Sequence, residues 1–133
     1  MKRVSAAWFV LVVILAMATT ASAQSTLKAN IPFDFAVGDK HLDKGEYVVR
    51  VDAGVVQLLS MKGSGAMALA QSAPPERSQS KNALVFRRYG DAIFLWKLLR
   101  ADGIARELPQ TRGEIEIARR YRNAPAIETA NAK

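Results

Sequence analysis

The sequence contains no cysteine and only one histidine among its 133 residues. Without cysteine the chain can form no disulfide, no thiolate metal site and no covalent thiol intermediate. It also lacks the cysteine that lipid modification after a cleavage site would require. A single imidazole, His41, falls short of the several histidine or cysteine ligands that zinc and copper sites use. We therefore expect no metal site, no cofactor and no cysteine chemistry.

Long apolar runs are also absent, because the longest run, residues 6–18, has only 13 members. A membrane-spanning helix needs roughly 20 apolar residues. The run follows Lys2 and Arg3 and precedes the small-x-small pattern Ala21-Ser22-Ala23, and this layout is typical of a secretory signal peptide. We predict that residues 1–23 are removed, that the protein is exported to the periplasm or beyond the cell, and that no membrane span remains.

The basic charge of the chain becomes smaller once the signal peptide is gone. Cleavage would leave 17 basic and 12 acidic residues, a net charge of +5. A basic surface can attract nucleic acid, anionic lipid or acidic polysaccharide. Because an exported protein seldom meets nucleic acid, we expect no nucleic-acid partner. We interpret the excess arginine and lysine as soluble surface.

Apolar and polar residues alternate over most of residues 26–108, which is typical of β-strands. A two-residue loop at Ala53-Gly54 would join the first clear hairpin. It predicts three cross-strand pairs: Val51 with Val56, Val49 with Leu58, and Tyr47 with Ser60. A second two-residue loop at Gly63-Ser64 would add a third strand. It predicts two further pairs: Leu58 with Leu69, and Ser60 with Met67.

Pro74-Pro75 and the polar residues after it predict a loop, because proline interrupts a central strand. Another hairpin follows around Gly90-Asp91, a sequence that favours a type I′ or II′ turn. It predicts five pairs: Phe86 with Leu95, Arg87 with Phe94, Arg88 with Ile93, Leu84 with Lys97, and Val85 with Trp96. Both faces of this hairpin carry apolar side chains, so we expect it to be covered on both sides.

The end of the chain is the one part with a helical pattern. Thr111 and Glu114 match a capping box and predict a short helix to about Arg122. Residues 123–133 are rich in alanine and polar residues, and we expect them to form a disordered tail. Residues 24–122 would then form a single β domain. We predict an all-β fold, a small barrel or sandwich of seven to eight short antiparallel strands with a short C-terminal helix.

Two strings of the sequence are distinctive, Ile31-Pro32-Phe33-Asp34-Phe35 and Arg88-Tyr89-Gly90-Asp91. With these strings the chain resembles a family of small exported bacterial proteins of unknown function, over nearly the whole of residues 24–133. It departs from the family at Leu42-Asp43-Lys44-Gly45, where members usually read Leu-Pro-Ala-Gly. The resemblance implies an exported all-β domain, and it implies no particular activity.

The predicted Gly90-Asp91 hairpin also carries the best candidate for a binding site. Arg87 and Tyr89 alternate with Phe94 and Trp96 across its two strands, and such a patch can stack on sugar rings or on a peptide. The competing interpretation is a second core layer beneath the C-terminal helix. We favour the core interpretation.

Catalytic patterns are weak throughout the sequence. His41 lies in a polar, turn-like segment, and we interpret it as a surface residue. The carboxylates of Asp34, Asp39 and Asp43 lie close together in the chain, but their spacing matches no calcium-binding loop. Aspartate commonly bonds turn amides, and we expect that role for Asp34 and Asp39.

These observations predict an exported, non-enzymatic binding or structural domain of the cell envelope, whose partner is an envelope protein or a glycan. One alternative is an envelope hydrolase that uses paired carboxylates. Glu107, Glu114 and Glu116 are available, but we interpret them as cap and surface charges. Another alternative is a subunit or adhesin component that assembles by strand addition.

Overall fold

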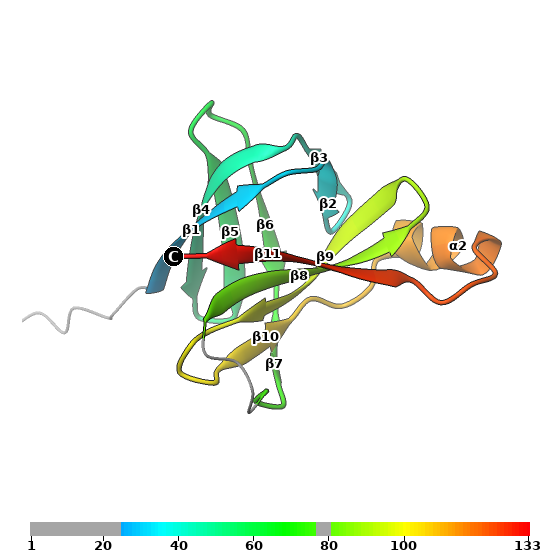
Figure 1. Ribbon diagram of the computed structural model, residues 1–133. Helices are drawn as coiled ribbons and strands as arrows, with labels where there is room; N and C mark the ends of the chain where they lie inside the picture. Colours follow the sequence, from blue (N-terminus) through cyan, green and yellow to red (C-terminus); the bar gives the residue numbers. More distant parts are fainter. Residues whose placement is uncertain (1–24, 77–80) are drawn as a thin grey trace, which may run out of the picture.

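The computed structural model describes residues 25–76 and 81–133, so the predicted signal peptide lies outside the described residues. The described chain forms one sheet that curls into a nearly closed barrel, with a short helix against its outside (Figure 1). The predicted all-β fold with a short helix near the C-terminus is confirmed. The elements are β1 (Ser25–Ile31), β2 (Phe35–Val37), β3 (Lys40–Leu42), β4 (Gly45–Asp52), β5 (Val55–Ser60), β6 (Gly65–Leu69), β7 (Gln71–Ala73), β8 (Asn82–Tyr89), β9 (Ala92–Leu99), β10 (Ala105–Glu107), α2 (Arg112–Arg120) and β11 (Ala126–Ala132).

Nine strands follow one another around the barrel in the order β3-β2-β9-β8-β11-β1-β4-β5-β6. The strand pairs are antiparallel except for β2 and β9, which run parallel. β10 pairs with both β9 and β7, and β7 follows β6 almost directly in the chain. This side connection links β9, the third strand of the order, to the segment that follows β6, the last strand. The barrel therefore has more strands than the predicted seven to eight, and its pairing is mixed.

A seam remains where β3 and β6 face each other without a hydrogen-bonded ladder. Cα atoms of β6 come within 8 Å of Cα atoms in β2 and β3. A strand inserted there would hold its two neighbours about 9–10 Å apart, twice the usual strand spacing. The seam therefore has no room for an added strand unless the β2–β3 hairpin moves.

The barrel interior is filled with large apolar side chains. Phe86 lies at its centre with no exposed surface. The rings of Phe33 and Phe35 meet it edge-on, with centroids 4.9 and 5.4 Å away. Such edge-to-face pairs add about 0.5–1.5 kcal/mol each to the area that they bury. Burial of these three rings, which come from β8, β2 and the segment before β2, stabilises the closed barrel.

The predicted register of the β4–β5 hairpin is confirmed at all three pairs. Ala53 and Gly54 both have positive φ, at 47° and 80°, as a type I′ turn requires. The register predicted for the next hairpin is wrong, because Leu58 faces Ala66 and not Leu69. Four residues, 61–64, and not two connect β5 to β6, and Ser60 N donates to Ser64 O at 2.7 Å. The shift places Ala66 inside the barrel and turns Leu69 outward.

The β8–β9 hairpin has its predicted turn and its three predicted pairs nearest to that turn. A β-bulge beyond Phe86 then gives β9 one extra residue, Trp96. The predicted pairs of Val85 with Trp96 and of Leu84 with Lys97 are therefore wrong, because Val85 faces Lys97 and Leu84 faces Leu98. The bulge allows β9 to keep Leu95 and Leu98 buried while both Trp96 and Lys97 point outward.

The expectation of a disordered tail is also wrong. β11 pairs with β8 at seven positions and lies between β8 and β1, inside the sheet. Its buried side chains are Ala130 and Ala132, which are 5% and 7% exposed. Because these residues are small, their period of two carries little apolar signal in the sequence. The main-chain ladder, which composition does not report, holds this strand in place.

Candidate functional site

The structure divides the four predicted site residues between two environments. Tyr89 and Phe94 are only 5% and 6% exposed, and they lie beneath α2 against Ile117 and Ala118. Their ring centroids are 6.1 Å apart in an edge-on arrangement. α2 covers both rings, and Phe94 also forms part of the base of a groove near the β8–β9 turn. Their place in the fold is that of a small second core.

Trp96 is half-buried and lies beside β10, not beneath α2. Its indole nitrogen donates a hydrogen bond of 2.9 Å to Glu107 Oε1. Two cations lie over the ring, with Arg87 Cζ at 4.8 Å and Lys97 Nζ at 4.1 Å from its centroid. These contacts are cation–π interactions, and they occupy ring surface that a sugar or peptide would need.

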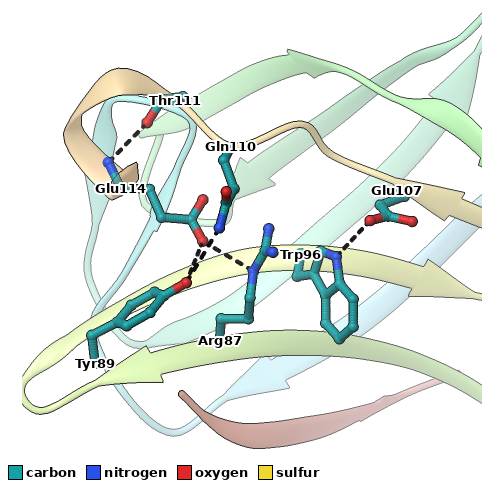
Figure 2. Close-up of polar contacts among 7 residues, drawn as sticks. All are labelled: Arg87, Tyr89, Trp96, Glu107, Gln110, Thr111 and Glu114. Carbon is teal, nitrogen blue, oxygen red and sulfur yellow. Dashed lines mark hydrogen bonds and ion pairs between the residues drawn. The ribbon is translucent and has the colours of Figure 1, made fainter. Parts of the chain in front are cut away.

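Arg87 also joins a buried polar cluster at the start of α2, which Figure 2 shows. The carboxylate of Glu114 is almost fully buried, and its Oε1 lies 3.0 Å from Arg87 Nε. The Tyr89 hydroxyl donates to the same oxygen at 3.3 Å, and Gln110 Nε2 donates to that hydroxyl at 3.4 Å. The Arg87 Nε contact is an ion pair without hydrogen-bond alignment.

The capping box predicted at the start of α2 is half present. Thr111 Oγ1 accepts a hydrogen bond of 3.3 Å from the main-chain N–H of Glu114. The Glu114 side chain does not return to the cap, because it turns toward Arg87 on β8. The local sequence predicted that the Glu114 side chain caps the helix. Its pairing with Arg87 could not be predicted in this way, because no local pattern indicates a contact between distant segments.

Burial is the dominant influence on the titration of this cluster. Desolvation raises the pKa of Glu114, while the Arg87 charge and the Tyr89 hydrogen bond oppose that rise. Desolvation and the neighbouring Glu114 charge both raise the pKa of Tyr89. The cluster connects α2 to the sheet, and its polar groups already bond to one another. We therefore interpret it as the attachment of the helix and not as a reaction centre.

A groove of about 450 Å³ brings several titratable side chains together near the β8–β9 turn. Asp34, His41, Asp43 and Asp91 line it, above an apolar base that includes Phe94. Asp34 Oδ1 accepts a 2.8 Å hydrogen bond from the main-chain N–H of Lys44, so its predicted turn role is confirmed. In residues 25–76 and 81–133, no three His, Asp or Glu side chains are placed to hold a metal ion.

A second groove, of about 430 Å³, opens on the outside of the barrel over β1 and β4, beside the C-terminal end of β11. Its polar lining comes from Lys28, Asn30, Glu46, Asn131 and Lys133. Its apolar lining includes Val48 and Met61.

This groove continues into an exposed apolar area on the β5–β6 hairpin. Met61, Met67 and Leu69 are 75%, 68% and 73% exposed, and together with the half-buried Val55 and Leu59 they form what we term the outer face. Sequence patterns did not indicate this area, because the predicted register placed Leu69 inside the barrel.

Comparison with known proteins gives no family assignment: no family model, no curated protein and no solved structure matches the chain. The resemblance described from the sequence strings therefore stays a prediction. Over the residues that the structure describes, no helix has the length and apolarity to cross a membrane.

Proposed function

We propose that the protein is an exported, non-enzymatic binding domain of the cell envelope that binds a partner protein through its outer face. One observation carries this proposal: Met61, Met67 and Leu69 gather on one hairpin and are each more than two-thirds exposed. Soluble monomers rarely expose contiguous apolar patches larger than a few hundred Å² unless the patch is functional. Methionine is also enriched in protein–protein interfaces.

The chemistry of the outer face favours a protein over a glycan. Sugar rings are commonly bound on exposed aromatic faces, and the residues of the outer face are methionine, leucine and valine. Flexible, polarizable methionine side chains adapt to irregular apolar surfaces, as partner proteins present. The aromatic residues predicted for ring stacking, Tyr89 and Phe94, are buried beneath α2.

The contacts in the groove lined by Asp34, Asp43 and Asp91 weigh against the hydrolase alternative. Asp34 already bonds the Lys44 amide, which is a structural role in a turn. Glu114 has a raised pKa, as a general acid would need, but it does not line that groove and is bonded to Arg87 and Tyr89. The narrow seam between β3 and β6 likewise weighs against assembly by strand addition at that place.

The test uses a photoactivatable phenylalanine analogue placed at Met67 in the full exported chain, with irradiation of intact cells. We expect a discrete adduct of higher mass. The matched control carries the same analogue at Tyr121, which is 37% exposed and lies at the end of α2, away from the outer face. The control should give no such adduct.

A second variant adds Leu69→Glu to the chain with the analogue at Met67. A charge at the centre of an apolar contact is expensive to desolvate, so the adduct should disappear. Absence of an adduct from Met67, or the same adducts from Met67 and Tyr121, would overturn the proposed function.

A further inference from the structure

The side chains on the outside of β1, β4, β5 and β6 form rows that run across the strands. Alternate residues of a strand point to the same side of the sheet, and the registers of the three ladders align them. One row runs from Lys28 through Val48 to Leu59. The next row has Arg50 on β4 and Met67 on β6. In both rows a cation on β1 or β4 is followed by an apolar side chain on β5 or β6.

The two cations form a strip alongside the outer face. Lys28 and Arg50 are both exposed. Within residues 25–76 and 81–133, neither side chain makes a hydrogen bond or an ion pair. Both charges are therefore available to a partner that lies on the neighbouring apolar side chains.

A partner cannot reach this part of the barrel by adding a strand. β4 pairs with β1 and β5, and β5 pairs with β4 and β6, so the main-chain groups of both inner strands are already used. The remaining edge of β6 faces the narrow seam with β3. The partner must therefore lie on the sheet and bind it through side chains.

The barrel already holds one helix in this manner. α2 lies on the outside of the β8–β9 hairpin (Figure 1), where Ile117 packs against Phe94. Glu114 of the same helix pairs with Arg87 on β8 at 3.0 Å. α2 thus combines an apolar stripe with a carboxylate that faces a cation on the sheet. The outer face and its cationic strip offer a second helix the same two kinds of contact.

We propose that the partner covers the outer face with an amphipathic helix whose acidic flank lies over Lys28 and Arg50. The inference rests on the proposed function, since it specifies the part of the partner that binds. The repeat distances agree. Residues two apart along a strand advance by about 6.7 Å, and residues four apart along a helix advance by about 6 Å. Apolar side chains at every fourth helical position therefore meet successive rows of the sheet.

The charges on this side of the sheet favour a protein helix over an anionic lipid surface. Glu46 and Asp52 are exposed on the same side, two positions along β4 from Val48 and Arg50 respectively. A flat anionic membrane would meet these carboxylates as well as the cations, and like charges repel. A helix can place its acidic residues over the cationic strip alone.

The test determines the conformation of the bound segment. The photoactivatable phenylalanine analogue is placed at Met61 in one full exported chain and at Leu69 in another, and the cross-linked partner residues are mapped by mass spectrometry. Met61 lies six positions after Val55, which pairs with Leu69. The two sites are therefore about 20 Å apart along the strand direction. A helix spans that distance in about 13 residues and an extended segment in about 6. We expect a spacing of about 13 residues.

A charge variant tests the acidic flank. Arg50→Glu, added to the chain with the analogue at Met67, should lower the adduct yield about three- to fivefold, because repulsion replaces an exposed ion pair. Arg50→Lys keeps the charge and should keep the yield. The matched control Arg122→Glu makes the same charge change beyond the end of α2, away from the outer face, and should leave the yield unchanged.

The outcomes separate this inference from the proposed function. A spacing other than about 13 residues, an adduct with a second copy of the chain, or an unchanged yield in Arg50→Glu would each overturn the helix. In those cases a discrete protein adduct at Met67 that is absent at Tyr121 leaves the proposed function standing. Lipid adducts at Met61, Met67 and Leu69, or no adduct at any of them, would overturn both proposals.

Discussion

The outsides of the β8–β9 and β5–β6 hairpins carry similar apolar side chains but differ in what covers them. On β8–β9, α2 packs over Tyr89 and Phe94 and leaves them 5% and 6% exposed. On β5–β6, Met67 and Leu69 are 68% and 73% exposed, and no helix lies over them in the described chain. The comparison shows that this fold can bury an apolar outer face with its own chain. The uncovered face is therefore the part that we assign to a partner.

The helical cover itself combines apolar and polar attachment. Ile117 and Ala118 supply its apolar contacts, and Glu114 supplies the ion pair with Arg87. A buried carboxylate costs free energy unless it is paired. The ion pair therefore fixes where α2 sits more than it adds to stability. The strength of the cover comes mainly from the apolar side chains beneath it.

The two faces should differ most in how much the truncation of a side chain lowers the free energy of unfolding. Phe94→Ala should lower the free energy of unfolding by about 3–5 kcal/mol, because it leaves a cavity beneath α2. The matched change Met67→Ala on the outer face should cost less than about 0.5 kcal/mol. Urea unfolding followed by circular dichroism measures both. Equal losses for the two variants would show that the outer face is also core.

The loss of stability on replacing Trp96 should fall between these two values, because Trp96 is half-buried and lies beside β10, not beneath α2. Trp96→Ala should cost about 1–3 kcal/mol, within the usual range for a lost packing contact and hydrogen bond. It is the sole tryptophan in residues 24–133, so its emission reports this site alone. We expect intermediate quenching by acrylamide. Complete protection from the quencher would indicate a cover that the structure does not show.

The burial of Glu114 predicts a smaller, pH-dependent effect on the stability of the protein. Burial raises the pKa of Glu114 above its ordinary value of 4.5. Its contribution to stability is therefore fully present below pH 4.5 and is lost as the pH rises through the folded-state pKa. In Glu114→Gln this loss should disappear, so the stability of the native protein relative to the variant should fall as the pH rises above 4.5.

Denaturant unfolding across this pH range measures the effect. The control is Glu116→Gln, on an exposed position of the same helix. Its pH profile should run parallel to that of the native protein. A parallel profile for Glu114→Gln as well would contradict the assigned role of burial.

Local patterns predicted those parts of the fold that local interactions determine. The Ala53-Gly54 and Gly90-Asp91 turns and the Thr111 cap are confirmed, because two-residue turns and caps depend on adjacent residues. The predictions that were wrong concern the four-residue connection after Ser60, the bulge at Trp96 and the strand at the C-terminus. The bulge and the C-terminal strand depend on pairing or packing between distant segments.

The same distinction between local and long-range interactions applies to the candidate site. Sequence patterns identified the Arg87 and Tyr89 hairpin as apolar on both faces, and the structure buries most of its outer side. The outer face could be identified only from the observed register of β6, which turns Leu69 outward. The groove over β1 and β4 is lined in part by Asn131 and Lys133, which sequence patterns had placed in a disordered tail.

The most direct test of the account uses the two methionines of residues 24–133, Met61 and Met67, which both belong to the outer face. Mild peroxide oxidation followed by mass spectrometry measures how accessible each thioether is. We predict rapid oxidation of both in the purified protein, and protection of both in intact cells, where the proposed partner would cover them. Leu69→Glu should restore oxidation in cells. Equal oxidation of the native protein in cells and in the purified state would contradict the assignment of the outer face to a partner.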